Sequence, residues 1–166
     1  MMATTHTNGF VGRMKKIVAM CAAGAAVAAM GACGASAHAE KSYTFNVDTG
    51  DAVKVTLDLG GGYDMSGKVP FEVTKDGDEI FEGSFLHEEG YELYRDEILG
   101  DENAQILNEG ERSGNDFIFW KTTADDATAY DYVVNVKDSS TVVLLEGTAG
   151  EEDAQQAFDH LTFTKE

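Results

Sequence analysis

The chain has 166 residues, and its 30 acidic residues far outnumber its 12 Lys and Arg residues. From Glu40 onward, nine basic residues face all 30 acidic ones, which gives this part a net charge near −21. Nucleic acid is therefore not an expected partner, because binding it requires a basic surface that displaces counterions. Adsorption to an anionic membrane surface is disfavoured for the same reason. A cationic partner is electrostatically favoured.

The first part of the chain has the pattern of a secretory signal peptide. Arg13, Lys15 and Lys16 precede an apolar run over residues 17–30, and small residues follow. Ala and Gly dominate the run, so it offers too little transfer free energy for a retained membrane helix. We expect residues 1–39 to be a signal peptide and tether, largely removed or disordered, and residues 40–166 to be a single exported acidic domain.

Two processing sites compete in this leader. Met30-Gly31-Ala32-Cys33 resembles the lipobox of bacterial lipoproteins. That resemblance implies lipidation of Cys33, a mature chain beginning there, and anchoring to the cell membrane in the envelope. Residues 37–39 form the alternative, an A-x-A site that would be cleaved between Ala39 and Glu40 and would release a secreted protein. We favour the lipid anchor, and secretion stays open.

Residues 40–166 contain no cysteine. A disulfide framework, a cysteine nucleophile and a thiolate metal site are thereby excluded from this part of the chain. Its stability must come from a packed apolar core.

Alternating apolar and polar residues predict a series of strands. The first two cover residues 43–48 and 53–59, joined by a turn, and a glycine-rich loop follows. Residues 71–82 predict a hairpin, because Asp-Gly at its centre adopts the positive φ angles of a tight turn. Further strands are expected over residues 117–121, 129–136, 141–146 and 161–164.

Two segments change to a helical period. Tyr91, Tyr94, Arg95 and Ile98 are spaced three and four apart, which predicts a helix over residues 88–99. Residues 148–151 match a capping box that opens a second short helix. The strands at 117–120 and 142–145 are apolar on both faces, so we expect a cover, chiefly helical, on each side of the sheet.

This order of elements weakly resembles the Mog1/PsbP-like α+β domains. The resemblance covers most of residues 43–164 and rests on element order alone. It implies an α+β fold, an antiparallel β-sheet flanked by one or two short helices. The alternative is an all-β sandwich in which residues 88–99 form a long loop.

No residue set predicts catalysis. His87 and His160 are the histidines of residues 40–166, and the pattern places one in a loop and the other at a helix end. Residues 62–69 come close to a P-loop, but Val69 stands where Ser or Thr should bind Mg²⁺, and no helix is expected to follow. We therefore expect no catalytic residue, no metal ligand and no cofactor. Calcium at the acidic loops 76–79 or 101–103 is the alternative.

The sequence thus predicts an exported, lipid-anchored envelope protein with a non-catalytic binding domain. Its partner would be an unidentified envelope protein or ligand, and the net negative charge favours a cationic one. Two alternatives stay open: an exported hydrolase that uses carboxylates alone, and a structural or stress-related lipoprotein. The hydrolase requires two carboxylates at a defined separation.

Overall fold

The computed structural model describes residues 39–125 and 127–166, and in this part of the chain most residues lie in antiparallel strands. Two α-helices and a short 3-10 helix accompany the strands. In chain order the elements are β1 (Glu40–Asn46), β2 (Ala52–Asp58), η1 (Gly60–Gly62), β3 (Tyr63–Met65), β4 (Phe71–Lys75), β5 (Asp78–His87), α1 (Glu89–Gly100), β6 (Ala104–Arg112), β7 (Asn115–Ala124), β8 (Ala127–Asn135), β9 (Thr141–Gly147), α2 (Glu151–His160) and β10 (Leu161–Lys165).

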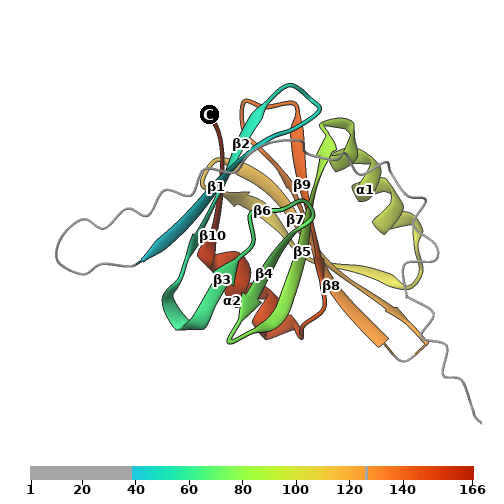
Figure 1. Cartoon of the computed structure of the whole chain (residues 1–166). Helices are drawn as coiled ribbons and strands as arrows, with labels where there is room; N and C mark the ends of the chain where they lie inside the picture. The colour runs from blue at the N-terminus through green and yellow to red at the C-terminus, as the bar shows by residue number, and fades with distance from the viewer. Residues whose placement is uncertain (1–38, 126) are drawn as a thin grey trace, which may run out of the picture.

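The strands form two sheets. The smaller has the order β1-β2-β10, and the larger has the order β3-β4-β5-β9-β8-β7-β6. Figure 1 shows the small sheet packed beside the strongly twisted large one, with α1 on the outside of the large sheet. The fold is therefore mainly antiparallel β with two helices, which fits the all-β alternative better than the α+β class.

The main core lies between the two sheets and is closed by α2. The rings of Phe45 and Phe85 lie 5.1 Å apart across this core, and Tyr132 stacks on Phe158 of α2 at 4.0 Å. Aromatic pairs at these distances stabilise the core beyond the contribution of the apolar area that they bury.

The helix predicted after residues 148–151 is present, since α2 begins at Glu151 and buries Ala154, Ala157 and Phe158. The capping box is wrong, because Gly150 is the N-cap without a side-chain hydrogen bond and the Thr148 hydroxyl donates to the Glu79 carbonyl oxygen (2.7 Å) instead.

A second core lies on the opposite face of the large sheet, under α1. Tyr94 and Ile98 of α1 pack there on Ile118, Trp120 and Val133 of the sheet, and Trp120 is 1% exposed. The prediction that both faces of these strands are covered is confirmed, but the cover is only partly helical, because α1 covers one face whereas the small sheet and α2 cover the other. The helix predicted over residues 88–99 is also confirmed, and the loop of the sandwich alternative is wrong at this point.

The sequence pattern did not predict two of the strands. β6 is the outer strand of the large sheet, and much of it is exposed, so its residues do not alternate between apolar and polar. β3 has three residues, too few to show a period. These two strands raise the share of sheet in the fold and account for the error in fold class.

The two ends of the small sheet differ in what surrounds them. At one end the Leu59 amide donates to the Ala39 carbonyl oxygen (2.8 Å), immediately before β1. At the other end, Asp51 in the β1–β2 turn accepts from the Ser140 amide (2.7 Å) and pairs with Lys165 (2.7 Å). The hydrogen bond from Lys165 lowers the pKa of Asp51 below its usual value. These contacts tie the turn to the β8–β9 turn and to the end of β10.

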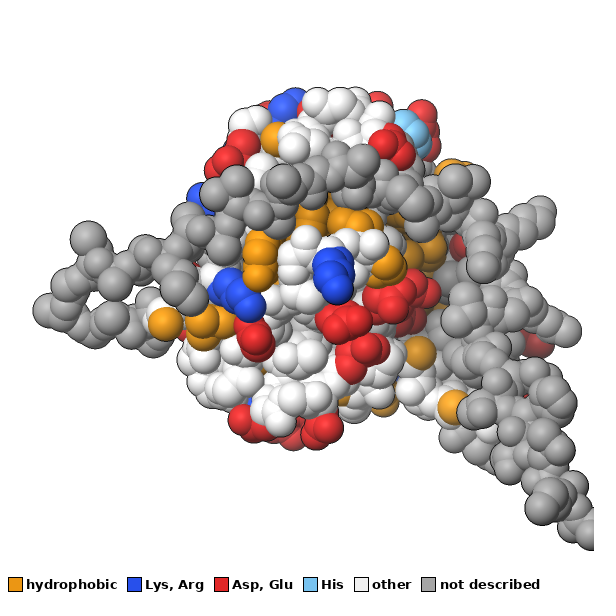
Figure 2. All heavy atoms as spheres, in the orientation of Figure 1, with side chains coloured by type: hydrophobic (Ala, Val, Ile, Leu, Met, Phe, Trp, Pro, Cys, Tyr) orange, Lys and Arg blue, Asp and Glu red, His pale blue; other side chains and the backbone are white. Residues whose placement is uncertain are grey.

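The acidic composition is visible on the surface. Figure 2 shows one face of the molecule, on which acidic side chains gather in patches beside a few Lys and Arg side chains.

Candidate functional site

The outer edge of β10 is the first candidate site. Within the described residues no strand pairs with this edge, because β10 ends the order of the small sheet. The Glu166 amide donates to the Ala52 carbonyl oxygen (2.9 Å), so backbone groups at even positions face β2. Successive residues of an antiparallel strand alternate between its two edges. The amide and carbonyl groups of Phe163 and Lys165 therefore point away from the sheet.

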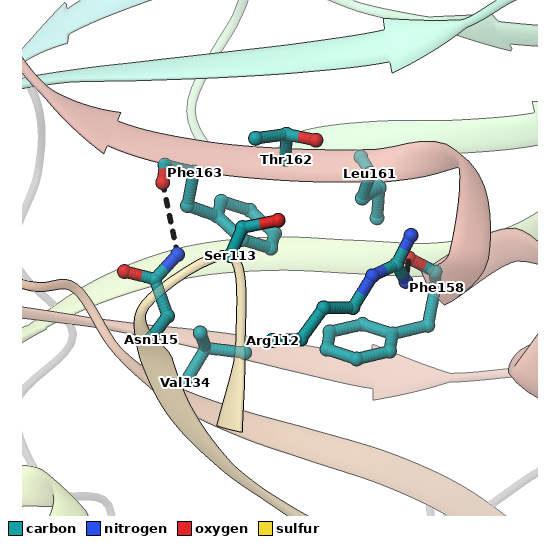
Figure 3. A pocket seen from close by; sticks show the side chains of 8 residues that line it. All are labelled: Arg112, Ser113, Asn115, Val134, Phe158, Leu161, Thr162 and Phe163. Atoms are coloured by element: carbon teal, nitrogen blue, oxygen red, sulfur yellow. Dashed lines mark hydrogen bonds between the residues drawn. The ribbon is translucent and has the colours of Figure 1, made fainter. Parts of the chain in front are cut away.

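Asn115 confirms this direction and fills the first part of the edge. Its Nδ2 donates to the Phe163 carbonyl oxygen (2.9 Å), and its Oδ1 accepts from the Lys137 amide (2.8 Å). Asn115 is 4% exposed. Figure 3 shows its side chain reaching from the β6–β7 hairpin to β10. The side-chain amide thus bridges β10 and the β8–β9 turn in the way that a main-chain amide would.

Beyond Asn115 the same gap opens into a groove of about 410 Å³. The groove is more open than enclosed and its lining residues are mainly polar, so it is a shallow surface groove and not an enclosed apolar ligand pocket. The groove is lined by residues of β10, the β6–β7 hairpin and the β8–β9 turn: Ser113, Asn115, Lys137, Asp138, Phe163, Thr164, Lys165 and Glu166. We call this feature the β10 groove.

The charges of the β10 groove balance, although the domain as a whole is strongly acidic. Lys165 pairs with Asp51, and Glu166 lies 3.5 Å from Lys54. Lys137 and Asp138 are neighbours of opposite charge on the wall. The groove therefore has no excess of either sign to select a charged ligand.

The other end of the β10 edge is closed by Arg112. Its guanidinium donates to the carbonyl oxygens of Phe158 and Asp159 and lies 3.1 Å from the Asp159 carboxylate. It also sits over the Phe158 ring, 5.2 Å from the centroid (Figure 3). A cation at these carbonyls stabilises the C-terminal end of α2. The cavity that remains there is about 10 Å³, room for roughly one water molecule.

A second candidate lies on the α1 face of the large sheet, where carboxylates follow one another across the strands. Glu72 pairs with Glu82, and Glu82 pairs with Glu146. Tyr132 pairs with Leu145, which puts Asp131 beside Glu146. Like charges on directly opposite residues destabilise a sheet.

Asp131 is the half-buried end of this row. Burial raises its pKa to about 7, a hydrogen bond from the Gly147 amide (2.8 Å) opposes the rise, and the charge of Glu146 adds to it. Trp120 pairs with Asp131 on the next strand. The Trp120 Nε1 atom, the Thr122 Oγ1 atom and the Glu97 Oε2 atom are buried and have no hydrogen-bond partner among the described residues.

The processing sites fall on both sides of the start of the described chain. Cys33 lies outside the described residues. Ala39 and Glu40 are described, and β1 begins at Glu40. Among residues 39–125 and 127–166, no helix has the length and apolar character needed to cross a membrane.

The histidines do not come together. His87 is exposed at the end of β5, whereas His160 ends α2, with its Nδ1 3.1 Å from the Asp58 carbonyl oxygen. The His160 ring also packs on Tyr63 at 4.3 Å. Neither histidine lies in the β10 groove.

The near-P-loop and the acidic loops have structural roles. β3 occupies residues 63–65 and β4 follows at Phe71, so no helix opens after the near-P-loop. Asp76 and Gly77 have φ of 53° and 95° and form the hairpin turn. Asp101 accepts from the Asn103 amide (2.8 Å). No group of three or more His, Cys, Asp or Glu side chains suited to a metal ion occurs in the described part of the chain.

Sequence reasoning missed the residues that shape the β10 groove. Asn115 stands in a polar run, between Ser113-Gly114 and Asp116, before an apolar stretch, which is typical of a turn. The feature that distinguishes Asn115 is the burial of its side chain, and the sequence does not show burial. Asp131 carried a weak signal, as an acidic residue in a strand whose neighbours are apolar or aromatic.

Comparisons of the chain with protein-family models, with curated proteins and with solved structures found no match.

Proposed function

We propose that this chain is an exported envelope protein, anchored by a lipid on Cys33, whose domain binds a partner polypeptide in the β10 groove. The observation that supports binding is a groove of about 410 Å³ beside an unpaired strand edge. Ligand sites are concave and few in any one protein. Release from the membrane by cleavage before Glu40 remains the alternative for localisation.

The position of the groove suits an anchored protein. Cys33 and Glu40 are seven residues apart in the sequence, a span of at most about 25 Å. An anchor at Cys33 would therefore hold the Glu40 end of β1 near the membrane. The β10 groove lies at the opposite end of the small sheet, where Lys165 contacts the β1–β2 turn (Figure 1). Its opening would be accessible to a partner away from the lipid surface.

The anchor is tested by the intact mass of the mature protein, recovered from membranes and from medium. We expect a lipid-modified chain beginning at Cys33 in the membrane fraction. A Cys33→Ala variant should lose the modification and the membrane association. A soluble wild-type chain beginning at Glu40 would contradict lipidation and would indicate ordinary secretion.

Binding in the groove is tested by a display library of random linear dodecapeptides, selected on the domain comprising residues 40–166. Thr164 is exposed and lines the groove, so Thr164→Trp should fill it and weaken binding of the selected peptides at least tenfold. Thr128→Trp is the matched control. It is an exposed threonine at the other end of β8, and it should leave binding unchanged.

A second candidate function is supported by Asp131 and Glu146. A carboxyl group with a pKa near 7 beside another carboxylate is the arrangement that a carboxylate-dependent hydrolase requires. Directly opposite strand residues have Cβ atoms about 5 Å apart, so the two carboxyl groups are neighbours on one face of the sheet. Hydrolysis of chromogenic glycosides by the wild-type domain, lost in Asp131→Asn, would support this candidate. Absence of hydrolysis by the wild-type domain would dismiss it.

A further inference from the structure

We infer that the β10 groove binds its partner by strand addition: an extended, uncharged polypeptide segment pairs with the outward-facing main-chain groups of β10 at Phe163 and Lys165. This inference rests on the proposed function and names the ligand of the same site. Strand addition takes its affinity from main-chain hydrogen bonds and its specificity from alternate side chains.

The direction of the backbone groups supports this mode. Two separate hydrogen bonds fix it, from the Glu166 amide to Ala52 and from Asn115 to the Phe163 carbonyl oxygen. Together they leave the amide and carbonyl of Lys165 and the amide of Phe163 facing the groove. An exposed edge of this kind is a template for another strand.

Asn115 shows that the gap has the width of a peptide unit. Its side-chain amide donates to β10 and accepts from the Lys137 amide on the opposite wall. A main-chain amide of a bound segment would make the same two kinds of hydrogen bond one step further along, beside Lys165. The groove is the continuation of the gap that Asn115 fills.

The balanced charge of the groove determines the chemistry of the segment. Lys165 and Glu166 are each paired with a residue outside the groove, Asp51 and Lys54. A bound segment therefore meets no net charge in the groove, and an uncharged segment fits it. The overall charge of the domain would attract a cationic partner over a long range. The affinity for such a partner would fall at high salt, unlike the affinity for an uncharged segment.

Lys165 allows the main-chain contact to be tested apart from its side chain. Proline at position 165 removes the outward amide and leaves the pairing with β2 intact, since proline is tolerated where the amide of an edge strand faces solvent. Lys165→Ala is the matched control, because it removes the same ion pair with Asp51 and keeps the amide. Both variants should fold.

The experiment measures the affinity of peptides from the dodecapeptide library. We expect Lys165→Pro to bind at least tenfold more weakly than Lys165→Ala, and the affinity of the wild type to change less than about twofold between 50 and 500 mM NaCl. Slower amide exchange at Phe163 and Lys165 in the complex should accompany binding.

The outcomes separate the two proposals. Peptides blocked by Thr164→Trp but bound equally by Lys165→Pro and Lys165→Ala would overturn strand addition and leave the groove as the binding site. A steep loss of affinity with salt would also overturn it, in favour of a charged ligand. If no peptide is selected, or if Thr164→Trp has no effect, both proposals fail.

Discussion

Replacing Asp131 by asparagine is expected to stabilise the domain at pH 8 by about 2–4 kcal/mol. Desolvation raises the pKa of this carboxyl group to about 7, so above that pH the folded protein holds a half-buried carboxylate beside Glu146. Asparagine keeps an oxygen that accepts the hydrogen bond from the Gly147 amide and carries no charge. The free energy of unfolding, measured by urea denaturation at pH 8, checks the expectation.

The same substitution should change how stability depends on pH. The folded pKa of Asp131 lies above the unfolded value of 3.8, so the folded state binds more protons between these two values. Stability therefore falls as the pH rises from about 4 to about 7, and it is constant above this range. The Asp131→Asn variant should lack this fall.

Other carboxyl groups act in a different pH range. The pKa of Asp51 and that of Asp64 are lowered by hydrogen bonds from Lys165 and Lys41, and their contribution is lost only as the pH falls below about 4. Glu146→Gln is the control for simple charge removal. It removes the lesser cause of the raised pKa of Asp131 and should leave most of the fall in place. An equal slope in wild type and Asp131→Asn would refute the assignment to Asp131.

Local patterns were sufficient for the elements that alternate or repeat. The hairpin at residues 71–82 was predictable because Asp76 and Gly77 occupy the positive-φ positions of a tight turn. The helix α1 was predictable from the spacing of Tyr94 and Ile98, which both reach the second core. Each of these features is decided by residues close together in the sequence.

The division into two sheets was not predictable from such patterns. β10 pairs with β2, and these strands are separated by about a hundred residues of sequence, so no local period reports the pairing. β6 has no alternation, because it lies at an exposed edge of the large sheet. The α+β expectation failed because it lacked β6 and β3 and because no local pattern divides the strands into two sheets.

The candidate site was the least predictable part for the same physical reason. The β10 groove arises where three segments meet, the β6–β7 hairpin, the β8–β9 turn and β10. Each contributes ordinary turn or strand residues, and none carries a catalytic motif. A site built from main-chain groups leaves little trace in the sequence, because any residue supplies the same amide and carbonyl.

Asn115→Ala is expected to destabilise the domain by about 2–3 kcal/mol. The substitution removes two hydrogen bonds, to the Phe163 carbonyl oxygen and from the Lys137 amide, at a side chain that is 4% exposed. A buried polar group left without a partner destabilises the protein by its desolvation penalty, in addition to the lost hydrogen bond. Asn46→Ala, at an exposed position at the end of β1, is the control and should change the free energy of unfolding by less than about 0.5 kcal/mol.

The same variant should respond differently in binding. Removing the Asn115 side chain frees the Phe163 carbonyl oxygen, so an added strand could pair with one more residue of β10. Peptides that bind the wild type should therefore bind Asn115→Ala at least as tightly, and they should recover part of its lost stability by mass action. If the variant bound these peptides more weakly in proportion to its lost stability, Asn115 would be a structural residue whose amide does not occupy the path of a strand.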